Sequence, residues 1–516
     1  MHRLPGIVNP SESRSRAANR YRRVDRAAFE THMQGKTSHS NQTASAFRSP
    51  SDVLAGISLA VALAAAPACT SIEKEDPERP PNIILVLADD LGYGDLSIQG
   101  HPLIHTPHID ALAREGQRWT SFYASAPLCN PSRVALVTGR MPIRIHGDGR
   151  NAWANMPDSE VTMAEMLKEL GYATAYVGKW GLSGRFDYQG SHPNDQGFDH
   201  FYGLVGSNDA PLREGFERTY ENIRNSTSAD FPISLYHQKE AIETPAYQPT
   251  LTRRYTEESV RWIREQRDRP FLLFLGHSMP HVPIFRSPEF EGHSDAGLYG
   301  DVIEEIDWSV GQLVNALAET GAASDTLVWF SSDNGPWRTY FDLGGSPGHL
   351  RDGKITSWEG GFRVPGVFWW PGTIDPGVID GIGVNVDLMA TVASLTGASL
   401  PAGRASDSID LSATLLRGDP SPRTEWFFYG QPGNLWAARV GNHKLVLESW
   451  ESLGTERQIG WRGYANHRKH DPPMLFDLST DASEQWDIAD RNPEVVASIR
   501  EAIKRHQAFI GRKESP

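Results

Sequence analysis

The sequence predicts an α/β fold, in which helices flank a large, mostly parallel sheet and a smaller C-terminal α+β domain carries an antiparallel sheet. Two observations predict the large sheet: apolar runs alternate with helix-like segments, and polar residues gather just after several of these runs. Past about residue 420 the apolar runs become shorter, which favours a second sheet. A length of 516 residues also exceeds what one hydrophobic core usually serves.

The first expected strand is NIILVLADD (82–90), a continuous apolar run that ends in two aspartates. Residues 106–115 predict a helix, with Thr106 as its cap and Pro107 at its first position. Three helix–strand units follow, over residues 161–181, 253–281 and 299–335. The chain ends in a helix near 493–508. We therefore expect a large domain over 80–419 and a small domain over 420–516.

Residues 1–79 predict a disordered leader and an acidic linker. The apolar run 53–66 is followed by the small residues Ala66 and Ala68, which is typical of a signal peptide over about 53–68. The run is too short to cross a bilayer comfortably. Cys69 resembles the acylated cysteine of bacterial lipoproteins, so a lipid anchor at Cys69 and a cleaved signal both stay open. We expect an exported protein that is periplasmic, secreted or lipid-anchored at the cell surface.

Composition excludes some classes of function. The formal net charge is -14 and 39% of the residues are hydrophobic, as in an ordinary globular protein with an acidic body. An acidic body argues against nucleic acid as a partner. The chain has only 2 cysteines, so once a signal segment is removed an internal disulfide is not expected.

Two pairs of side chains with oxygen ligands predict a metal site. Asp89-Asp90 and Asp333-Asn334 each follow an expected strand. Adjacent carboxylates repel unless a cation offsets their charge, and ligand sets made only of oxygen suit Ca²⁺ or Mg²⁺ better than Zn²⁺. For either pair alone, a side chain that caps the following turn would be the better interpretation, but two pairs at corresponding positions favour a metal.

Three cations stand among glycines and aromatics or at a helix start, where a solvated surface charge is not expected: Arg133, Lys179 and Lys354. Three cations opposite a metal site predict a pocket that binds a tetrahedral oxyanion. Cys129 lies at the expected first turn of a helix, where the dipole favours an anion, so we expect a lowered pKa and a reactive thiol. Together these features suggest attack on an ester of sulfate or phosphate.

The segment CNPSRVALVTGR (129–140) matches a specific signature throughout. Through it the chain resembles the formylglycine-dependent sulfatases of the alkaline phosphatase superfamily, and within them the group of arylsulfatase A and N-acetylgalactosamine-6-sulfatase. The resemblance covers roughly residues 80–515 and implies an alkaline-phosphatase-like catalytic domain over 80–419. Its other motifs are ADDLGYGD (88–95), GYATAYVGKWG (171–181), HSMPHVP (277–283), SSDNGP (331–336), GKITSWEGGFRVP (353–365) and LFDLSTDASE (475–484).

The resemblance implies that a formylglycine-generating enzyme oxidises Cys129 to formylglycine (3-oxoalanine), directed by Pro131 and Arg133. One hydroxyl of the hydrated aldehyde then attacks sulfur and the alcohol leaves, after which the second hydroxyl expels sulfate as the aldehyde forms again. The implied Ca²⁺ ligands are Asp89, Asp90, Asp333, Asn334 and the modified Cys129. The other implied roles are sulfate binding by Lys179 and Lys354, support of the modified residue by Arg133, protonation of the leaving alcohol by His281, and a donor to sulfate from Ser207.

One position departs from the family pattern. Gly181 stands where many members carry a histidine that helps to deprotonate the diol. His146 is a candidate substitute base, although an ordinary surface histidine is an equal interpretation, and His192 and His200 are weaker candidates.

The leading hypothesis is a sulfatase that hydrolyses sulfate monoesters of a sulfated saccharide, with aryl sulfates as surrogate substrates. Four aromatic residues are candidates for stacking on a sugar or for core packing: Trp180, Trp337, Tyr340 and Trp358. A phosphonate or phosphate monoester hydrolase of the same superfamily is the alternative enzyme. A glycan-binding homologue with weakened catalysis, suggested by Gly181, is the alternative from another class.

Overall fold

We describe a computed structural model of the chain, which places residues 80–145, 155–183, 190–266, 269–430, 433–452 and 466–511. The expected signal segment, a lipid anchor at Cys69 and the candidate base His146 lie outside these residues. Within the described ranges, no helix combines the length and the apolar character needed to span a membrane.

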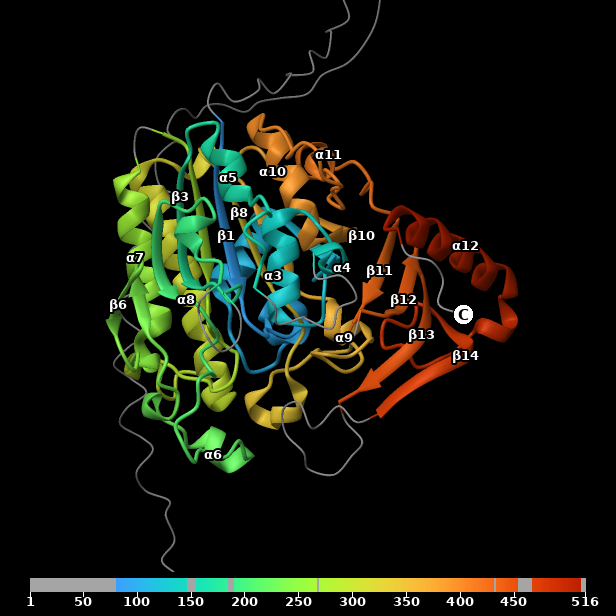
Figure 1. The fold of residues 1–516 in the computed structure, drawn as a ribbon, viewed down its shortest axis with the longest axis horizontal. Coiled ribbons are helices and arrows are strands. Elements are labelled where there is room, and N and C mark those ends of the chain that lie inside the picture. The colour runs from blue at the N-terminus through green and yellow to red at the C-terminus, as the bar shows by residue number, and fades with distance from the viewer. Residues whose placement is uncertain are drawn as a thin grey trace, which may run out of the picture. The chain divides into compact units, whose positions relative to one another are not determined.

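A ten-stranded sheet forms the larger part of the structure (Figure 1). Neighbouring strands from β8 to β4 pair in parallel, and so do β10 and β2, whereas β9 and the β5–β6 hairpin pair antiparallel. The predicted α/β class with a mostly parallel sheet is therefore confirmed. In spatial order the strands are β10 (Gly377–Val384), β2 (Gln117–Tyr123), β9 (Gly366–Trp369), β8 (Thr326–Ser332), β1 (Asn82–Ala88), β7 (Phe271–Gly276), β3 (Ala173–Lys179), β4 (His200–Leu204), β5 (Leu235–His237) and β6 (Glu240–Glu243).

Helices cover both faces of this sheet, which explains why β1 is apolar at nearly every position. Ile84 and Val86 of β1 belong to one apolar core, and the neighbouring Ile83 and Leu85 belong to the other. The helices α2 (Pro107–Glu115), α7 (Leu251–Glu265) and α8 (Gly297–Thr320) contribute to the first core. The second core includes side chains of α3 (Cys129–Thr138), α5 (Met163–Lys168), α10 (Leu388–Thr396) and α11 (Ser412–Arg417).

The start of α2 differs from the expectation in one detail. Thr106 occupies the N-cap position and Pro107 the first helical position, but the Thr106 side chain does not cap the helix. Its hydroxyl donates instead to Asp110 Oδ1 at 2.9 Å. The N–H groups of His108 and Ile109 donate to the carboxylate of Asp307 on α8, at 3.2 and 2.8 Å. A side chain from a distant helix therefore satisfies the exposed donors of this helix end.

The predicted C-terminal antiparallel sheet is also confirmed. Its strands are β11 (Glu425–Tyr429), β12 (Leu435–Val440), β13 (His443–Glu451) and β14 (Asn466–Asp477), and α12 (Pro493–Phe509) packs against it. Lys444 of β13 makes buried ion pairs with Glu359 (3.0 Å) and Glu484 (2.8 Å). Glu359 begins α9 (Glu359–Phe362), so this network joins the small sheet to the segment that follows Lys354.

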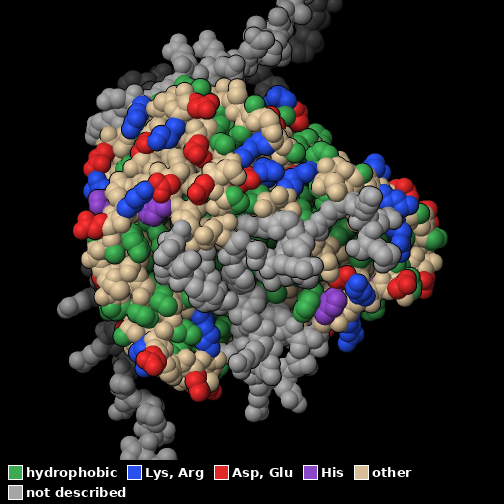
Figure 2. Space-filling view, in the orientation of Figure 1, with side chains coloured by type: hydrophobic (Ala, Val, Ile, Leu, Met, Phe, Trp, Pro, Cys, Tyr) green, Lys and Arg blue, Asp and Glu red, His purple; other side chains and the backbone are tan. Residues whose placement is uncertain are grey.

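The remaining helices are short and lie in connections: α4 (Pro142–Ile145) and α6 (Tyr220–Arg224). On the face drawn in Figure 2, acidic and basic side chains are interspersed, and histidines lie among them.

Candidate active site

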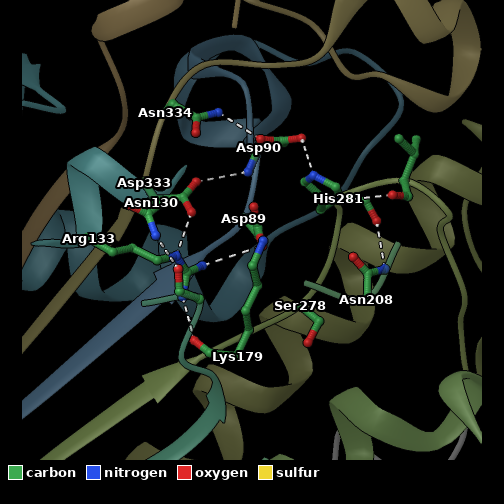
Figure 3. Close-up of polar contacts among 12 residues, drawn as sticks. Asp89, Asp90, Asn130, Arg133, Lys179, Asn208, Ser278, His281, Asp333 and Asn334 are labelled. Carbon is green, nitrogen blue, oxygen red and sulfur yellow. Dashed lines mark hydrogen bonds and ion pairs between the residues drawn. The ribbon is translucent and has the colours of Figure 1, made fainter. Parts of the chain in front are cut away.

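Four central strands deliver side chains to one edge of the large sheet (Figure 3). Asp89 follows β1, Lys179 ends β3, and Asp333 follows β8. His281 lies five residues beyond β7, and the start of α3 adds Cys129 and Arg133. Ligands in open α/β sheets bind at the carboxyl ends of the strands, and the structure brings the predicted residues together at this edge.

The turn after β1 directs two buried carboxylates into the site. The Asp89 N–H donates to the Met279 carbonyl at 3.1 Å, and the Asp90 N–H donates to Asp333 Oδ1 at 3.2 Å. Asp90 has a φ of 66°, in the left-handed region that few residues other than glycine adopt. Backbone strain at a position held by such contacts is typical of functional sites.

Each carboxylate contacts a cation. Lys354 Nζ lies 2.6 and 2.8 Å from the two oxygens of Asp90, and Lys179 Nζ pairs with Asp89. Arg133 Nε donates to Asp333 Oδ2 at 2.7 Å. The three predicted cations and the three predicted carboxylates therefore form one buried network.

Arg133 is held rigidly by groups from the sheet. Its Nη1 donates to the Lys179 carbonyl at 2.6 Å, and its Nη2 lies 3.5 Å from Asp89 Oδ2. Burial alone would lower the pKa of the Arg133 guanidinium, but Asp333 and Asp89 raise it overall. Arg133 therefore stays charged although it is only 1% exposed.

Cys129 is the first residue of α3 and is buried. Burial raises the pKa of its thiol, and this effect exceeds the opposite effect of Lys179 and Lys354. The expectation of a lowered pKa from the helix start is therefore wrong, because removal of the thiolate from water outweighs the local positive charge. Unmodified Cys129 is a neutral thiol at pH 7 and a poor nucleophile.

The oxygen atoms of this network fit a hard divalent cation. Ligand atoms of Asp89, Cys129 and Asp333 all lie within 4.8 Å of one another. Asn334 Nδ2 donates to Asp90 Oδ1 at 2.7 Å, and among the described residues the buried Asn334 Oδ1 and Asp89 Oδ1 have no hydrogen-bond partner. Burial, together with repulsion from Asp89 and Asp333, raises the pKa of Asp90 to about 7 despite Lys354. Ca²⁺ prefers such oxygen ligands and would offset this repulsion.

His281 is neutral and has a defined tautomer. Its Nδ1 lies 2.7 Å from the Val282 carbonyl, which only accepts, so Nδ1 carries the hydrogen. Nε2 then faces Asp90 Oδ2 at 3.7 Å. Burial, followed by the charges of Lys354 and Lys179, holds the pKa of His281 well below its usual value.

The loop after β4 adds residues that sequence reasoning missed. Ser207, which was predicted, lies beside Asn208, whose Nδ2 donates to the carbonyls of His281 (3.2 Å) and Pro283 (3.0 Å). Asp209 pairs with Arg218 at 3.0 Å. Although burial acts in the opposite direction, the charge of Arg218 holds the pKa of Asp209 well below its usual range. The GSND motif marked this loop, but its contacts with His281 depend on the tertiary fold.

The two candidate substitute bases that the structure describes, His192 and His200, have other partners. His192 accepts a hydrogen bond from the Asn194 N–H at 3.2 Å, and His200 lies 2.7 Å from Glu258. Gly181 has a φ of 74°, and a Cβ there would lie 3.4 Å from Lys179 Cε. The described residues thus supply no imidazole at the position of Gly181.

All four candidate stacking residues are buried. Trp180 packs against Tyr176, and Trp358 packs against Phe476, so both belong to the apolar cores. Trp337 contacts Lys354, whose Nζ lies 4.2 Å from the ring centre, and Tyr340 packs against Trp337. For Trp180 and Trp358 the structure favours core packing.

Comparison with known proteins gives consistent results. The profile described as Sulfatase matches residues 81–398, and the profile described as the C-terminal region of aryl-sulfatase matches residues 421–515. Arylsulfatase A of Bos taurus is 36% identical over 83% of this chain and 87% of that protein. N-acetylgalactosamine-6-sulfatase of Sus scrofa is 34% identical over 84% of this chain and 87% of that protein. The crystal structure of PsFucS1 sulfatase from Pseudoalteromonas sp. superposes with a TM-score of 0.72 at 28% identity, covering 84% of this chain and 91% of that one.

Proposed function

Because this chain belongs to the sulfatase family and is a sulfuric ester hydrolase, we propose that it hydrolyses sulfate monoesters of a carbohydrate with a formylglycine made from Cys129 and a bound Ca²⁺. One observation carries the proposal: Cys129 is buried at the start of α3 beside Lys179 and Lys354, within a network of three carboxylates. The neutral thiol itself is unsuited to attack on sulfur, which favours its conversion into another nucleophile.

Asp89, Asp90, Asp333 and Asn334 would hold the Ca²⁺, together with the modified Cys129. A bound divalent cation supplies positive charge that stabilises the oxygens of the transition state. Formylglycine supplies an oxygen nucleophile and a route for release of sulfate that an ordinary cysteine or serine lacks. Arg133 orients Asp333 and the Lys179 carbonyl from the same helix that carries Cys129.

Lys179 and Lys354 supply the charge that binds the sulfate oxygens. Their ammonium groups are already positioned by Asp89 and Asp90, so little conformational freedom is lost when an anion enters. Ser207 adds a hydroxyl from the loop after β4. The hydrogen bond from Asn208 Nδ2 to the His281 carbonyl holds this loop beside His281.

His281 would protonate the leaving alcohol from Nε2. Its pKa is low because Lys354 and Lys179 add to the effect of burial, and a bound sulfate ester offsets the charge of both lysines. Binding of substrate therefore favours the protonated imidazole. The Val282 carbonyl holds Nδ1–H, which leaves Nε2 as the atom that exchanges the proton.

The substrate proposal is a sulfated saccharide, with aryl sulfates as surrogates. The similarity to N-acetylgalactosamine-6-sulfatase supports a sugar sulfate. We further propose maturation by a formylglycine-generating enzyme and export to a periplasmic, secreted or lipid-anchored location, on the basis of the sequence near Cys69.

Co-expression with a formylglycine-generating enzyme tests the mechanism. Mass spectrometry of the Cys129 peptide should show the aldehyde, and the protein should then release sulfate from sulfated saccharides and aryl sulfates but not from Cys129→Ala. An unmodified thiol in active protein would overturn the formylglycine proposal. Turnover of phosphate or phosphonate esters alone would favour the alternative enzyme, and saccharide binding without turnover would favour the glycan-binding homologue.

The metal proposal is tested separately with Asp333→Ala and the matched surface variant Asp325→Ala. Chelation and Ca²⁺ titration should show strong Ca²⁺ dependence of activity in the unmodified sequence and in Asp325→Ala. Asp333→Ala should lose high-affinity Ca²⁺ binding by calorimetry. Equal Ca²⁺ binding by both variants would contradict the assignment.

A further inference from the structure

A second group of metal-type side chains lies away from the carboxylate network. His200 begins β4, His237 ends β5, and Glu258 lies on α7. Ligand atoms of the three residues all lie within 4.8 Å of one another. From this arrangement we propose that His200, His237 and Glu258 bind one Zn²⁺ ion.

Strand register explains why the three side chains meet. His237 pairs with Tyr202 across β4 and β5, and residues two apart on a strand share a face, so His200, Tyr202 and His237 point to one side. Helix α7 covers that side, since Arg254 Nε donates to the Tyr202 hydroxyl at 3.0 Å. Glu258 is four positions beyond Arg254 and therefore lies on the same face of the helix.

His200 and Glu258 already form a close pair in the absence of an ion. His200 Nε2 lies 2.7 Å from Glu258 Oε1, but the nitrogen is buried and lacks a partner in hydrogen-bond geometry among the described residues. The rings of His200 and His237 have centroids 5.6 Å apart. A Zn²⁺ ion between His200 and Glu258 would replace this pair and separate the two atoms to about 3.4 Å.

The ligand types select zinc over calcium. Two imidazoles and one carboxylate, with water in the fourth position, suit tetrahedral Zn²⁺, whereas the carboxylate network offers oxygen ligands. Ligands at about 2.1 Å from a tetrahedral ion lie about 3.4 Å apart. His237 is exposed at the β5–β6 turn, so a small rotation of its side chain can complete this geometry.

Arg261 competes with the ion for Glu258. Its Nε donates to Glu258 Oε2 at 3.0 Å, its Nη2 donates to Glu258 Oε1, and its Nη1 pairs with Glu265 at 2.6 Å. A guanidinium on the ligand carboxylate opposes a second cation at the same group. Removal of this charge should therefore strengthen Zn²⁺ binding, which an ordinary ion-pair cluster would not predict.

A bound Zn²⁺ would join three elements at the edge of the large sheet. It would connect β4, the β5–β6 hairpin and α7, and the loop that leaves β4 carries Ser207, Asn208 and Asp209 to the candidate active site. An ion that binds only the folded chain stabilises it, so Zn²⁺ should raise the melting temperature.

The test uses the full-length protein, stripped of metal with chelator and then saturated with Ca²⁺. Titration with Zn²⁺ is followed by calorimetry, and Co²⁺ is used as a probe because four-coordinate Co²⁺ absorbs strongly in visible light. Loss of an outer partner costs about 10–100-fold in metal affinity, so loss of a ligand in His237→Ala should cost at least about 100-fold. Arg261→Gln should bind more tightly, and His443→Ala, on β13, should match the unmodified sequence.

Loss of the Zn²⁺-induced rise in melting temperature in His237→Ala, but not in His443→Ala, would support the site. Since His237 is exposed, its replacement leaves the apo protein folded, and the melting temperature without Zn²⁺ verifies this. Absence of Zn²⁺ binding by the unmodified sequence, or equal affinity in His237→Ala, would overturn the proposal. Sulfate release is not part of the readout, so the result is independent of the proposed function.

Discussion

Lys354 Nζ lies 2.6 Å from Oδ1 and 2.8 Å from Oδ2 of Asp90, although the two residues are 264 positions apart in the chain. The Lys354 N–H also donates to the Pro336 carbonyl at 2.9 Å, next to the turn that carries Asp333 and Asn334. One lysine thus links the Asp90 carboxylate to the backbone that follows a second strand end. The ammonium group is buried, so its charge acts with little screening by water.

Replacement of Lys354 should therefore impair catalysis strongly. Lys354→Met retains most of the side-chain volume and removes the charge, and kcat/KM for an aryl sulfate should fall by about 10²–10³-fold, as when one oxyanion donor is lost. The control is Lys239→Met, which removes an exposed lysine that pairs with Asp195. Loss of less than about tenfold, with Lys239→Met unchanged, would show that Lys354 does not bind the sulfate group.

The role of His281 as a proton donor predicts a dependence on the leaving group. His281→Asn keeps a donor for the Val282 carbonyl and removes Nε2. General acid catalysis contributes about 10²–10⁴-fold, so sugar sulfates should lose activity in this range, whereas aryl sulfates with acidic phenols should lose much less. Steady-state kinetics on a series of sulfate esters gives the comparison. Equal losses across the series would contradict proton donation by His281.

Gly181 and Gly171 are a test position and its control for the effect that an added side chain has on stability. Both have positive φ values, 74° and 80°; a Cβ at 171 meets no atom within 4 Å, and one at 181 meets Lys179 and Arg133 only at ordinary contact distance. Gly181→Ala and Gly171→Ala should each cost about 1–2 kcal/mol in the free energy of unfolding, from backbone strain alone. A much larger loss for Gly181→Ala in urea denaturation would mean that the site has no space for a side chain.

Asp307 should make stability depend on pH. Burial raises the pKa of its carboxyl to about 7. Between its unfolded value near 3.8 and about 7 the folded protein holds this proton and the unfolded chain does not, so stability falls as pH rises through this window. In Asp307→Asn, this loss of a few kcal/mol in the free energy of unfolding across the window should disappear. Thermal melts at several pH values measure it, and Asp325→Asn is the exposed control; equal slopes would refute the assignment.

Lys444 should be essential for attachment of the small sheet. Its ion pairs with Glu359 and Glu484 are fully buried, and removal of one partner from such a pair costs about 3–5 kcal/mol. Lys444→Met should therefore lower stability by this amount in urea denaturation. Lys504→Met breaks an exposed pair with Glu501 on α12, which water screens, and should leave stability nearly unchanged. Similar effects of both variants would contradict the importance of the buried network.

Sequence reasoning was most reliable where a local pattern has one structural solution. The apolar run of β1 and the alternation of helices with strands required a covered sheet, and parallel strands bring Asp89, Lys179 and Asp333 to one edge. The antiparallel β9, inserted between β2 and β8, has no comparable local signal. Thr106 likewise had the sequence of a cap, but the Asp307 carboxylate reached the helix end instead.

The sequence by itself determined the class of fold, the family, and the residue types of the candidate site, because strand periodicity and the CNPSR motif are local properties of the chain. Only the tertiary structure decided their electrostatic state. Burial made Cys129 a neutral thiol and His281 a neutral imidazole, since desolvation depends on everything packed around a group. It also decided which distant residues meet, as with Asn208 and His281, or His200, His237 and Glu258, because strand register and helix docking set those distances.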